Sequence, residues 1–399
     1  MTADTASPPV FDPNAPETLA DPYAAYRRLR DNAPAHYIAS WRTWALSRFE
    51  DLWEWGGDAD YFTATEGTTA PYLVTGAIEP AENVNHMDPP EQPRLRKALM
   101  RFFLPAAMRE RETSVRAIIR ETLEPFVAGG EADAVGDIGR VIATRVASDA
   151  IGFPASDRER IHDFMSRFFM SVGAAPGTEE LGALAMADMR AYLAELAGQR
   201  RSHRGEPEHV IDVLLRVDTG HGPLDDEEVG DHLVPLLVGA TETFPKFASA
   251  AIHRLWQHQD QRRLLALDVQ AVPGAVRECL RLDMPTQMSM RRVRRDLELH
   301  GQRLAPGDSV MFLWASGNRD ERVFDDPDRL DVRRPIPRTL SFGHGLHRCL
   351  GAHLAELEGR VLLEELLAVA PEYEVDEVRL ERTRNAFFSA HERLPIRLR

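Results

Sequence analysis

The amino-acid sequence predicts a mainly α-helical protein with a small β region. Over most of the first 280 residues, apolar side chains recur at three- and four-residue spacing, which is typical of helices that bury one face. Prolines and glycines separate these runs. Strand-like segments are few and short, with Gly, Pro and Asp between them. We therefore expect a small sheet at one side of a helical body.

The predicted elements follow from these patterns. Helices are expected over Pro22 to Arg30, Ala107 to Val127, Asp137 to Ile151, Asp157 to Met170, Glu179 to Arg201 and Asp226 to Gln257. Strands are expected over Ala35 to Ile38, Thr43 to Leu46, Met290 to Val293, Leu297 to Leu299 and Val310 to Leu313. Two segments without regular pattern are expected to be binding loops, Thr63 to Pro90 and Gly173 to Gly177.

The domain organisation is expected to be simple. Met1 to Pro16 contains four prolines and no apolar stretch like that of a signal peptide, so residues 1–16 are predicted to form a flexible N-terminal tail. No linker, repeat or low-complexity block interrupts the remainder. Residues 17–399 are therefore predicted to form a single domain.

Charge and composition exclude several classes of function. The chain has 48 Lys plus Arg against 63 Asp plus Glu, a formal net charge of −15, which argues against a nucleic-acid partner. No stretch approaches the roughly 18 apolar residues that a membrane span needs, so no membrane association is expected. The two cysteines, Cys279 and Cys349, cannot form a disulfide framework, and they fit a reducing, cytoplasmic location.

The strongest local signal is a glycine-rich loop, Ser341 to Gly351, which places Cys349 just before a helical run from Ala352 to about Val369. A helix N-terminus favours thiolate over thiol, and the glycines of the loop let main chain approach the sulfur closely. From the residues alone, three interpretations stay open. They are a buried structural cysteine, a thiolate ligand to haem iron, and a zinc site that would add His344, His347 and His353.

This loop resembles the haem-binding signature of the cytochrome P450 family, Phe-x-x-Gly-x-x-x-Cys-x-Gly. Phe342, Gly345, Cys349 and Gly351 occupy its four fixed positions, and Gly343 lies between them. The resemblance extends over nearly the whole chain. It implies the family's fold, a triangular helical prism that encloses haem b, with Cys349 as the axial ligand of the iron.

A second motif lies upstream of the loop. Glu278 and Arg281 are three residues apart on an expected helix, and alone they would be read as a surface ion pair. The family carries Glu-x-x-Arg at this place and pairs it with an Arg of a Pro-x-Arg segment, which here is Pro327-Asp328-Arg329. The resemblance thus implies a buried structural triad of Glu278, Arg281 and Arg329.

The predicted helix 226–257 matches the family's oxygen-binding helix. Its small-Gly-x-acid-Thr pattern fits Gly239, Ala240, Glu242 and Thr243, with Ala240 in place of the commoner Gly. On residues alone, Thr243 could merely donate to the carbonyl four residues earlier. The resemblance implies that the small residues leave room for O2, and that Glu242 and Thr243 are catalytic residues of a proton relay.

Pro245 departs from the family's pattern after the threonine. It has no N–H, so the carbonyl of Thr241 loses its helical partner. Two explanations stay open: the carbonyl holds a water of the relay, or the proline kinks the helix for packing alone.

Haem propionates are anions and need cationic or hydrogen-bonding partners. By resemblance these partners are His347, Arg291 and Arg96. The family usually has His-x-x-x-Arg on the helix that contains Arg96. This chain has Gln92 in place of that histidine, so this contact is expected to be weaker or lost.

The resemblance implies a haem-thiolate monooxygenase that inserts one oxygen atom of O2 into a small or mid-sized, mainly apolar substrate, with hydroxylation as the expected reaction. Aromatic and methionine side chains suggest the apolar pocket: Phe168, Phe169, Met170, Met288 and Phe388. Two alternatives stay open, a peroxide-driven haem-thiolate enzyme and a non-catalytic haem-thiolate sensor or carrier. The Glu242-Thr243 pair speaks against the sensor.

The electron supply is expected to be external, because no flavin or iron–sulfur motif is present. A ferredoxin and a ferredoxin reductase are the implied partners. The segment from Arg94 to Arg111 has six basic residues against Glu110. Together with Arg338 and Arg348 it is a candidate docking patch for an acidic ferredoxin.

Overall fold

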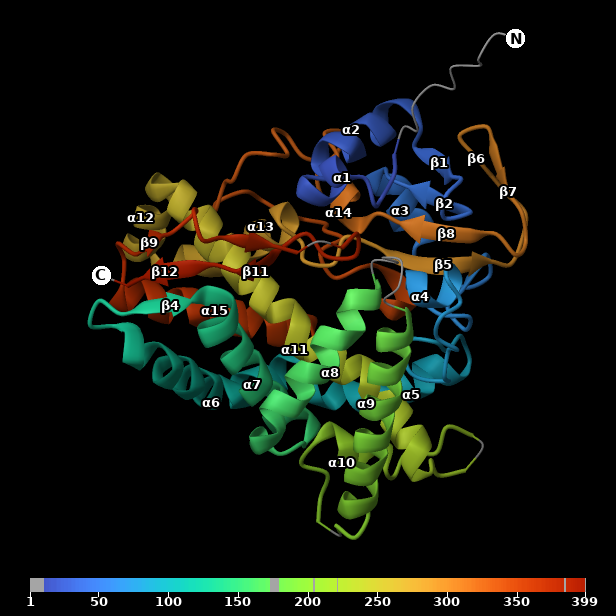
Figure 1. Cartoon of the computed structure of the whole chain (residues 1–399), viewed down its shortest axis with the longest axis horizontal. Helices are drawn as coiled ribbons and strands as arrows, with labels where there is room; N and C mark the ends of the chain where they lie inside the picture. Colours follow the sequence, from blue (N-terminus) through green and yellow to red (C-terminus); the bar gives the residue numbers. More distant parts are fainter. Residues whose placement is uncertain (1–10, 173–178, 204, 221, 384, 399) are drawn as a thin grey trace.

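Helix α11 (Asp226–Gln257) runs through the middle of the molecule, and other helices surround it (Figure 1). The computed structural model describes residues 11–172, 179–203, 205–220, 222–383 and 385–398. A capping box defines the start of α11: the Glu228 N–H donates to the Asp225 carboxylate, and the Asp225 N–H donates to the Glu228 carboxylate, each at 2.8 Å. The bounds of α11 are those predicted.

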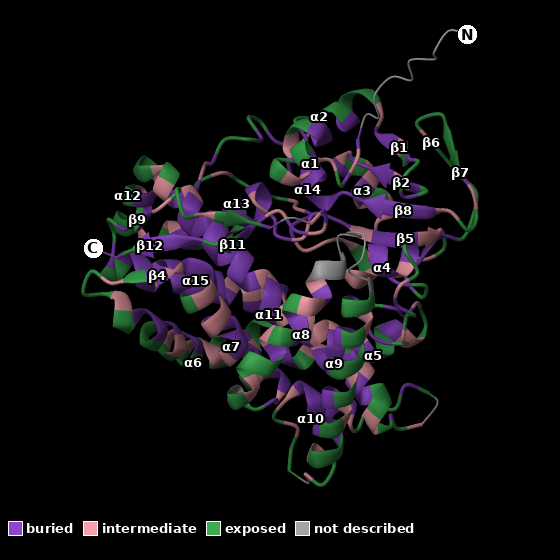
Figure 2. Cartoon of the chain, in the orientation of Figure 1, coloured by how far each residue is buried: buried purple, intermediate pink, exposed green. Residues whose placement is uncertain are grey.

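The helices that contact α11 come from separate parts of the chain. They are α9 (Glu179–Arg200), α7 (Val141–Ile151) with the π-helical turn η3 (Ala134–Arg140) before it, α13 (Val272–Leu282) and α15 (Ala352–Val369). Figure 2 shows that α11 is largely buried, whereas the outer helices alternate between buried and exposed faces. This alternation is the amphipathic pattern that predicted them.

Two more helices complete this layer. α6 (Pro105–Leu123) packs on α15, and α8 (Arg158–Val172) packs on α9. Because α15 follows the cysteine loop and packs on both α6 and α11, the loop is attached to the helical body through α15.

The main sheet lies at one side of the helical body (Figure 1) and has the strand order β1-β2-β8-β5-β3. β1 (Ala35–Ile38) and β2 (Thr43–Leu46) are antiparallel. β8 (Ser309–Phe312) pairs parallel to β2 and antiparallel to β5 (Ser289–Val293), and β3 (Phe62–Thr63) closes the edge against β5. The strand β5 carries Arg291 into the interior.

The remaining elements are short. The helices are α1 (Pro16–Ala20), α2 (Tyr23–Asn32), α3 (Phe49–Trp55), α4 (Ala70–Leu73), α5 (Glu91–Leu99), η1 (Met100–Phe102), η2 (Glu124–Phe126), η4 (Ala155–Asp157), α10 (Val210–Leu214), α12 (Gln259–Leu267), η5 (Val269–Ala271), α14 (Trp314–Gly317) and η6 (Gly345–His347). The strands are β4 (Glu131–Asp133), β6 (Leu297–Leu299), β7 (Gln302–Leu304), β9 (Glu374–Val375), β10 (Glu381–Arg382), β11 (His391–Arg393) and β12 (Pro395–Arg397).

Apolar side chains form two buried clusters. The larger one lies among the helices around α11, and the smaller one lies between the main sheet and the N-terminal helices. Tyr72 and Phe387 pack against both clusters. The segments that carry these two residues therefore lie at the junction between the helical body and the sheet.

The fold confirms the predicted mainly α architecture with a small β region. The tail prediction does not hold for residues 11–16. Phe11 is buried with its ring centroid 5.8 Å from that of Tyr26, and α1 already begins at Pro16. The predicted loop Gly173 to Gly177 lies outside the described residues. Within the described ranges, no helix is long and apolar enough to cross a membrane.

Candidate functional site

The cysteine loop presents its thiol just before α15. The Cys349 N–H donates to the Phe342 carbonyl at 2.8 Å, and the Gly351 N–H binds the sulfur. Gly345 has φ +73°, and a Cβ there would lie 2.1 Å from the Cα of Gly57, so only glycine fits. The loop thus holds Cys349 in a defined position with a main-chain donor on its sulfur.

The Cys349 side chain is solvent-accessible, yet protein encloses it closely enough that burial raises the pKa of the thiol. The Gly351 N–H and the nearby charges of Arg348 and Arg96 act in the opposite direction. The expected preference for thiolate at a helix start is therefore outweighed by desolvation. A cation bound at the sulfur would supply the compensation that the thiolate needs.

A cluster of basic groups lies beside this loop. Arg291 of β5 is buried, and burial lowers its pKa to about 10. Within the described chain, its hydrogen bond is from Nη1 to the Met290 carbonyl at 2.7 Å, and no carboxylate binds it. Burial and the charges of Arg291, Arg96 and His86 lower the pKa of His347 to about 3. A partly buried basic cluster of this kind suits an anionic ligand.

Helix α5 is tied to the cysteine loop by the two residues singled out on it. Gln92 donates from Nε2 to the Leu346 carbonyl at 3.0 Å, and Arg96 donates from Nη2 to the Arg348 carbonyl at 2.6 Å. The Gln92 Oε1 is buried without a hydrogen-bond partner in the described structure. Gln92 thus links α5 to the cysteine loop, because its amide NH2 group binds the Leu346 carbonyl.

The predicted residues of α11 lie where the helix becomes accessible. Gly239 is exposed although most of the helix is buried, and the Thr243 hydroxyl donates to its carbonyl at 2.7 Å. This is the back-bond that residue type alone allowed, and it orients the Thr243 oxygen. The Glu242 carboxylate is buried and pairs with Lys246, with Nζ 3.0 Å from Oε2.

Pro245 has a packing partner. A Cβ added to the buried Gly139 of η3 would lie 2.7 Å from the Cα of Pro245. The main chains of η3 and α11 therefore approach closely at the proline, which supports the packing explanation. Helix α11 continues through Pro245 to Gln257.

The structural triad differs from the predicted one at its third member. Glu278 and Arg281 are fully buried and form two hydrogen bonds, of 2.7 and 2.9 Å. The third partner is Arg334, whose Nε lies 3.0 Å from Oε1 of Glu278. Arg329, the predicted partner, is on the surface and pairs with Asp331. The prediction for Arg329 is wrong because the turn after Asp331 directs Arg334 inward.

The zinc interpretation finds no cluster of ligands. Among the described residues, no group of three or more His, Cys, Asp or Glu side chains could hold a metal ion. His344 instead stacks on Trp53, with ring centroids 3.9 Å apart, and His353 lies 3.8 Å from Glu356. Within the described ranges, Cys349 therefore stands apart from any such group of ligands.

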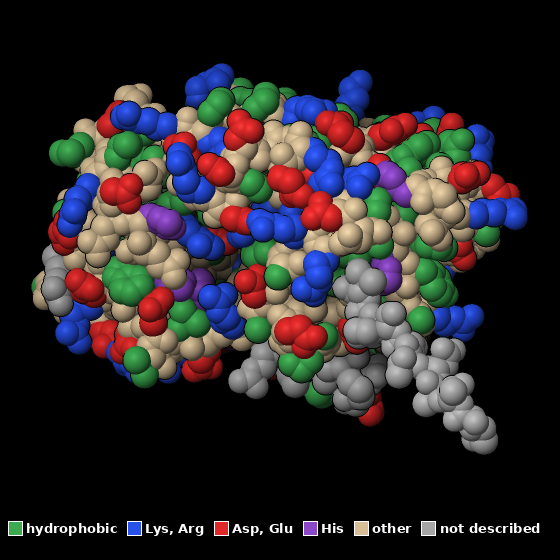
Figure 3. Space-filling model, turned by 90° about the horizontal axis from the view of Figure 1, so that it is seen from above, with side chains coloured by type: hydrophobic (Ala, Val, Ile, Leu, Met, Phe, Trp, Pro, Cys, Tyr) green, Lys and Arg blue, Asp and Glu red, His purple; other side chains and the backbone are tan. Residues whose placement is uncertain are grey.

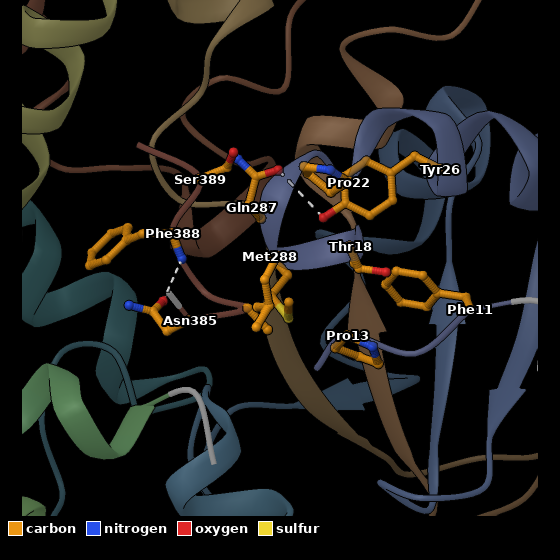
Figure 4. A pocket seen from close by; sticks show the side chains of 12 residues that line it. Phe11, Pro13, Thr18, Pro22, Tyr26, Gln287, Met288, Asn385, Phe388 and Ser389 are labelled. Carbon is orange, nitrogen blue, oxygen red and sulfur yellow. Dashed lines mark hydrogen bonds between the residues drawn. The ribbon is translucent and has the colours of Figure 1, made fainter. Parts of the chain in front are cut away.

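Some of the aromatic residues predicted to line the substrate pocket lie together in the structure. Phe168 is buried, and the rings of Phe169 and Phe388 lie 4.8 Å apart. Met288 and Phe388 also line a pocket that opens toward the N-terminal segment (Figure 4). The side chain of Met170 lies outside the described residues.

Sequence reasoning missed three residues of this region: Lys246, Arg334 and His86. The Glu242-x-x-x-Lys246 spacing is a signal for a pair on one helix face, although its burial is not visible in the sequence. His86 precedes Asp88-Pro89-Pro90 by two residues, and its charge acts on His347.

The residues present fit an iron porphyrin. A Cβ added to Gly239, Gly343 or Gly351 would meet no neighbouring atom within 4 Å, so both the helix and the loop have room for a flat group. One accessible thiol suits a metal, and the basic cluster of Arg96, Arg291 and His347 suits carboxylates. A group that combines a metal with carboxylates satisfies both.

Known proteins resemble this chain over nearly its whole length. The family model described as cytochrome P450 matches residues 178–377. The chain is 30% identical over 381 residues to the cytochrome P450 monooxygenase PikC of Streptomyces venezuelae, which covers 93% of this chain and 90% of that protein. It is 33% identical over 362 residues to a vitamin D(3) 25-hydroxylase of Pseudonocardia autotrophica, covering 88% and 87%.

A solved structure shows the same architecture. It is that of P450BioI in complex with an acyl carrier protein ligated to hexadec-9Z-enoic acid, and it superposes with a TM-score of 0.86 at 26% identity. The match covers 96% of this chain and 100% of that one.

Proposed function

Because the chain belongs to the cytochrome P450 family and is an oxidoreductase of that type, we propose that it is a monooxygenase in which Cys349 is the axial ligand of haem b. The observation that carries this proposal is the accessible thiol beside a basic cluster whose buried member, Arg291, has no carboxylate hydrogen-bonded to it in the described chain. When bound, thiolate-ligated haem activates O2 for insertion of one oxygen atom into a substrate. The proposed single haem domain over 17–399 is extended to include residues 11–16, because Phe11 is buried against Tyr26 of α2.

The basic cluster would hold the propionates. Arg291 is best placed for this role, because it is buried and offers donors that the described residues leave without a carboxylate. Arg96 adds positive charge from α5, and the neutral imidazole of His347 adds a hydrogen-bond donor from the loop. Gln92 supports the site by bracing the loop at Leu346.

Glu242 and Thr243 would move protons. The Thr243 hydroxyl donates to Gly239, so its oxygen can accept a hydrogen bond from an incoming donor. Glu242 is the adjacent acid on α11 and can exchange a proton with solvent as it turns. Ala240 and Gly239 keep this part of the helix free of bulky side chains.

The substrate is proposed to be a small or mid-sized apolar molecule, with Phe168, Phe169, Met288 and Phe388 as wall residues. The relatives act on different molecules by their names, so the shared fold does not select a substrate for this chain. The apolar and aromatic character of the wall is the support for an apolar substrate.

Electrons are proposed to come from a ferredoxin and its reductase, which dock near the cysteine loop. Three basic residues of the expected docking patch already have partners within the protein, so they are less available to a ferredoxin. Arg111 pairs with Asp149, Arg338 pairs with Glu50, and Arg96 donates to the Arg348 carbonyl. A groove between α6, α13 and α15 is lined by the basic Arg109, Arg277 and Arg360 and also by the acidic Glu112 and Glu356. The face seen in Figure 3 also has interspersed acidic and basic side chains.

The test is turnover of purified holoenzyme on a molecule that shifts its haem spectrum. Product that forms with NADH, ferredoxin reductase, ferredoxin and O2 supports the proposal. Product that forms only with added hydrogen peroxide identifies the peroxide-driven alternative. Binding without product in either assay identifies the sensor or carrier.

A further inference from the structure

Lys246 is an unusual residue in this chain. It is one of only two lysines, the other being Lys97, and all other permanently charged basic residues are arginines. Its side chain is 5% exposed, and that of its partner Glu242 is 10% exposed. A buried ion pair is costly unless each charge is well paired, so the pair constrains both side chains. Within the described chain, Lys246 supplies the hydrogen bond to the Glu242 carboxylate.

Two aromatic rings lie close to the ammonium group of Lys246. The Nζ atom lies 4.6 Å from the ring centroid of Phe388 and 5.9 Å from that of Phe169. These distances are in the range of cation–π attraction. The two rings also contact each other, with centroids 4.8 Å apart. The position of Nζ therefore depends on the rings as well as on Glu242.

The rings come from two elements that are independent of α11. Phe169 is on α8, and Phe388 lies between β10 and β11, where the Phe388 N–H donates to the Asn385 side chain at 2.8 Å. Figure 4 shows the Phe388 ring pointing away from Phe11 and Tyr26. Phe388 thus lines the outer pocket, and its ring lies next to Lys246. A ligand that moves this wall acts on the ammonium group directly.

One further titratable group, His162, lies near the Lys246–Glu242 pair. His162 of α8 interacts electrostatically with both Glu242 and Lys246, as well as with Arg140 and Glu159. Burial lowers the pKa of His162, and its Nδ1 has no hydrogen-bond partner among the described residues. Among the residues that the structure describes, Lys246 is thus the cation that contacts the Glu242 carboxylate.

We propose that Lys246 is a positioning residue that ties the Glu242 carboxylate to the aromatic wall of Phe169 and Phe388, so that a ligand which displaces these rings also loosens the Lys246–Glu242 pair. Without a ligand, the ammonium group holds Oε2 and keeps Glu242 from turning toward Thr243. With a ligand on the wall, Glu242 is released to exchange protons. The inference rests on the proposed monooxygenase function and adds that proton delivery depends on substrate.

The first test observes Lys246 directly in the wild-type holoenzyme. Lysine labelled with ¹³C at Cε gives signals from two side chains, and Lys97 serves as the internal reference. The probe is 4-phenylimidazole, an aromatic ligand of haem iron. We expect the Lys246 signal to shift when the probe binds, with the Lys97 signal unchanged. A haem spectrum that responds to the probe while Lys246 does not move overturns the inference. A haem spectrum that does not respond overturns the proposed function instead.

The second test measures the consequence for coupling. Lys246→Met removes the charge and keeps the length of the side chain, whereas Lys246→Arg keeps the charge. Without substrate, we expect Lys246→Met to increase NADH oxidation roughly tenfold, as a holding energy of about 1.4 kcal/mol would give. Lys246→Arg should retain most of the restraint on Glu242, because the positive charge is kept. A Lys246→Met enzyme with unchanged haem spectrum and unchanged NADH oxidation contradicts the inference. If that variant does not fold, the labelled-lysine measurement decides.

Discussion

Arg334 and Glu278 form a buried ion pair, with Nε of Arg334 3.0 Å from Oε1 of Glu278. The guanidinium group also donates from Nη2 to the carbonyls of Asp326 and Arg329. Arg281 binds the same carboxylate and donates to the carbonyls of Asn318 and Pro327. Through these two arginines, Glu278 on α13 is linked to residues 326–334, which precede the cysteine loop.

We expect Arg334→Ala to lower the free energy of unfolding by about 3 to 5 kcal/mol, because it leaves a buried carboxylate with one partner fewer. Haem content after purification should fall as well. The matched control is Arg329→Ala, which removes an exposed side chain and should change stability by less than about 1 kcal/mol. Denaturant unfolding of both variants is the measurement. Equal losses in the two variants would contradict the assignment of Arg334.

Replacing Arg291 should raise the stability of the haem-free protein and weaken haem retention in the haem-bound protein. Arg291→Met removes a buried charge that has no carboxylate partner, so we expect the apoprotein to become more stable. The holoenzyme should lose a charge-assisted contact worth roughly 1.5 to 3 kcal/mol, which raises the rate of haem loss by roughly 10- to 100-fold. Thermal unfolding of the apoprotein and haem transfer to apomyoglobin measure the two effects.

The control for Arg291 is Arg292→Met on the same strand. Arg292 pairs with Glu66 at the surface and should leave haem retention unchanged. If Arg291→Met retained haem as well as Arg292→Met, the propionate role of Arg291 would be lost.

Thr243→Ala should keep the haem but divert electrons to peroxide. Proton delivery by a positioned group contributes roughly 10²- to 10⁴-fold in rate, so most turnover becomes uncoupled without it. Thr241→Ala is the control, because the Thr241 hydroxyl donates to the Leu237 carbonyl and is buried in the helix. The measurement is the ratio of product formed to NADH consumed. Full coupling in Thr243→Ala would show that Thr243 is not needed for proton delivery.

Charge reversal near the cysteine loop should slow reduction by an acidic ferredoxin. Lys97 and Arg109 are exposed, and we expect Lys97→Glu with Arg109→Glu to lower the association rate by at least about tenfold at low ionic strength. High salt should narrow the difference, because it screens exposed charges. Arg303→Glu on the β6–β7 hairpin is the control. Stopped-flow reduction that does not depend on salt or on these changes would exclude the patch.

The elements that sequence predicted best are those with strong local signals. The bounds of α11 follow from its capping box and its long apolar periodicity, and those of α15 follow from the glycine-rich loop before it. The loop's four fixed positions single out Cys349 as the candidate ligand of the iron. These features depend on neighbouring residues, so they are visible in the sequence.

The features that sequence could not predict depend on contacts between distant segments. Arg329, Arg333 and Arg334 lie within six residues of one another, and only the turn after Asp331 decides which one reaches Glu278. The burial of Lys246 depends on rings from α8 and from the β10–β11 segment. The strand order of the main sheet joins segments from the two ends of the chain, which no local pattern encodes.

The most direct test is the absorption spectrum of the ferrous carbonyl form of the purified, haem-supplemented protein and of Cys349→His. Thiolate opposite carbon monoxide gives the strongly red-shifted Soret band, and we predict this band for the wild type and its loss in the variant. A wild-type carbonyl spectrum like that of an imidazole-ligated haem, or a protein that binds no haem, would contradict the role of Cys349.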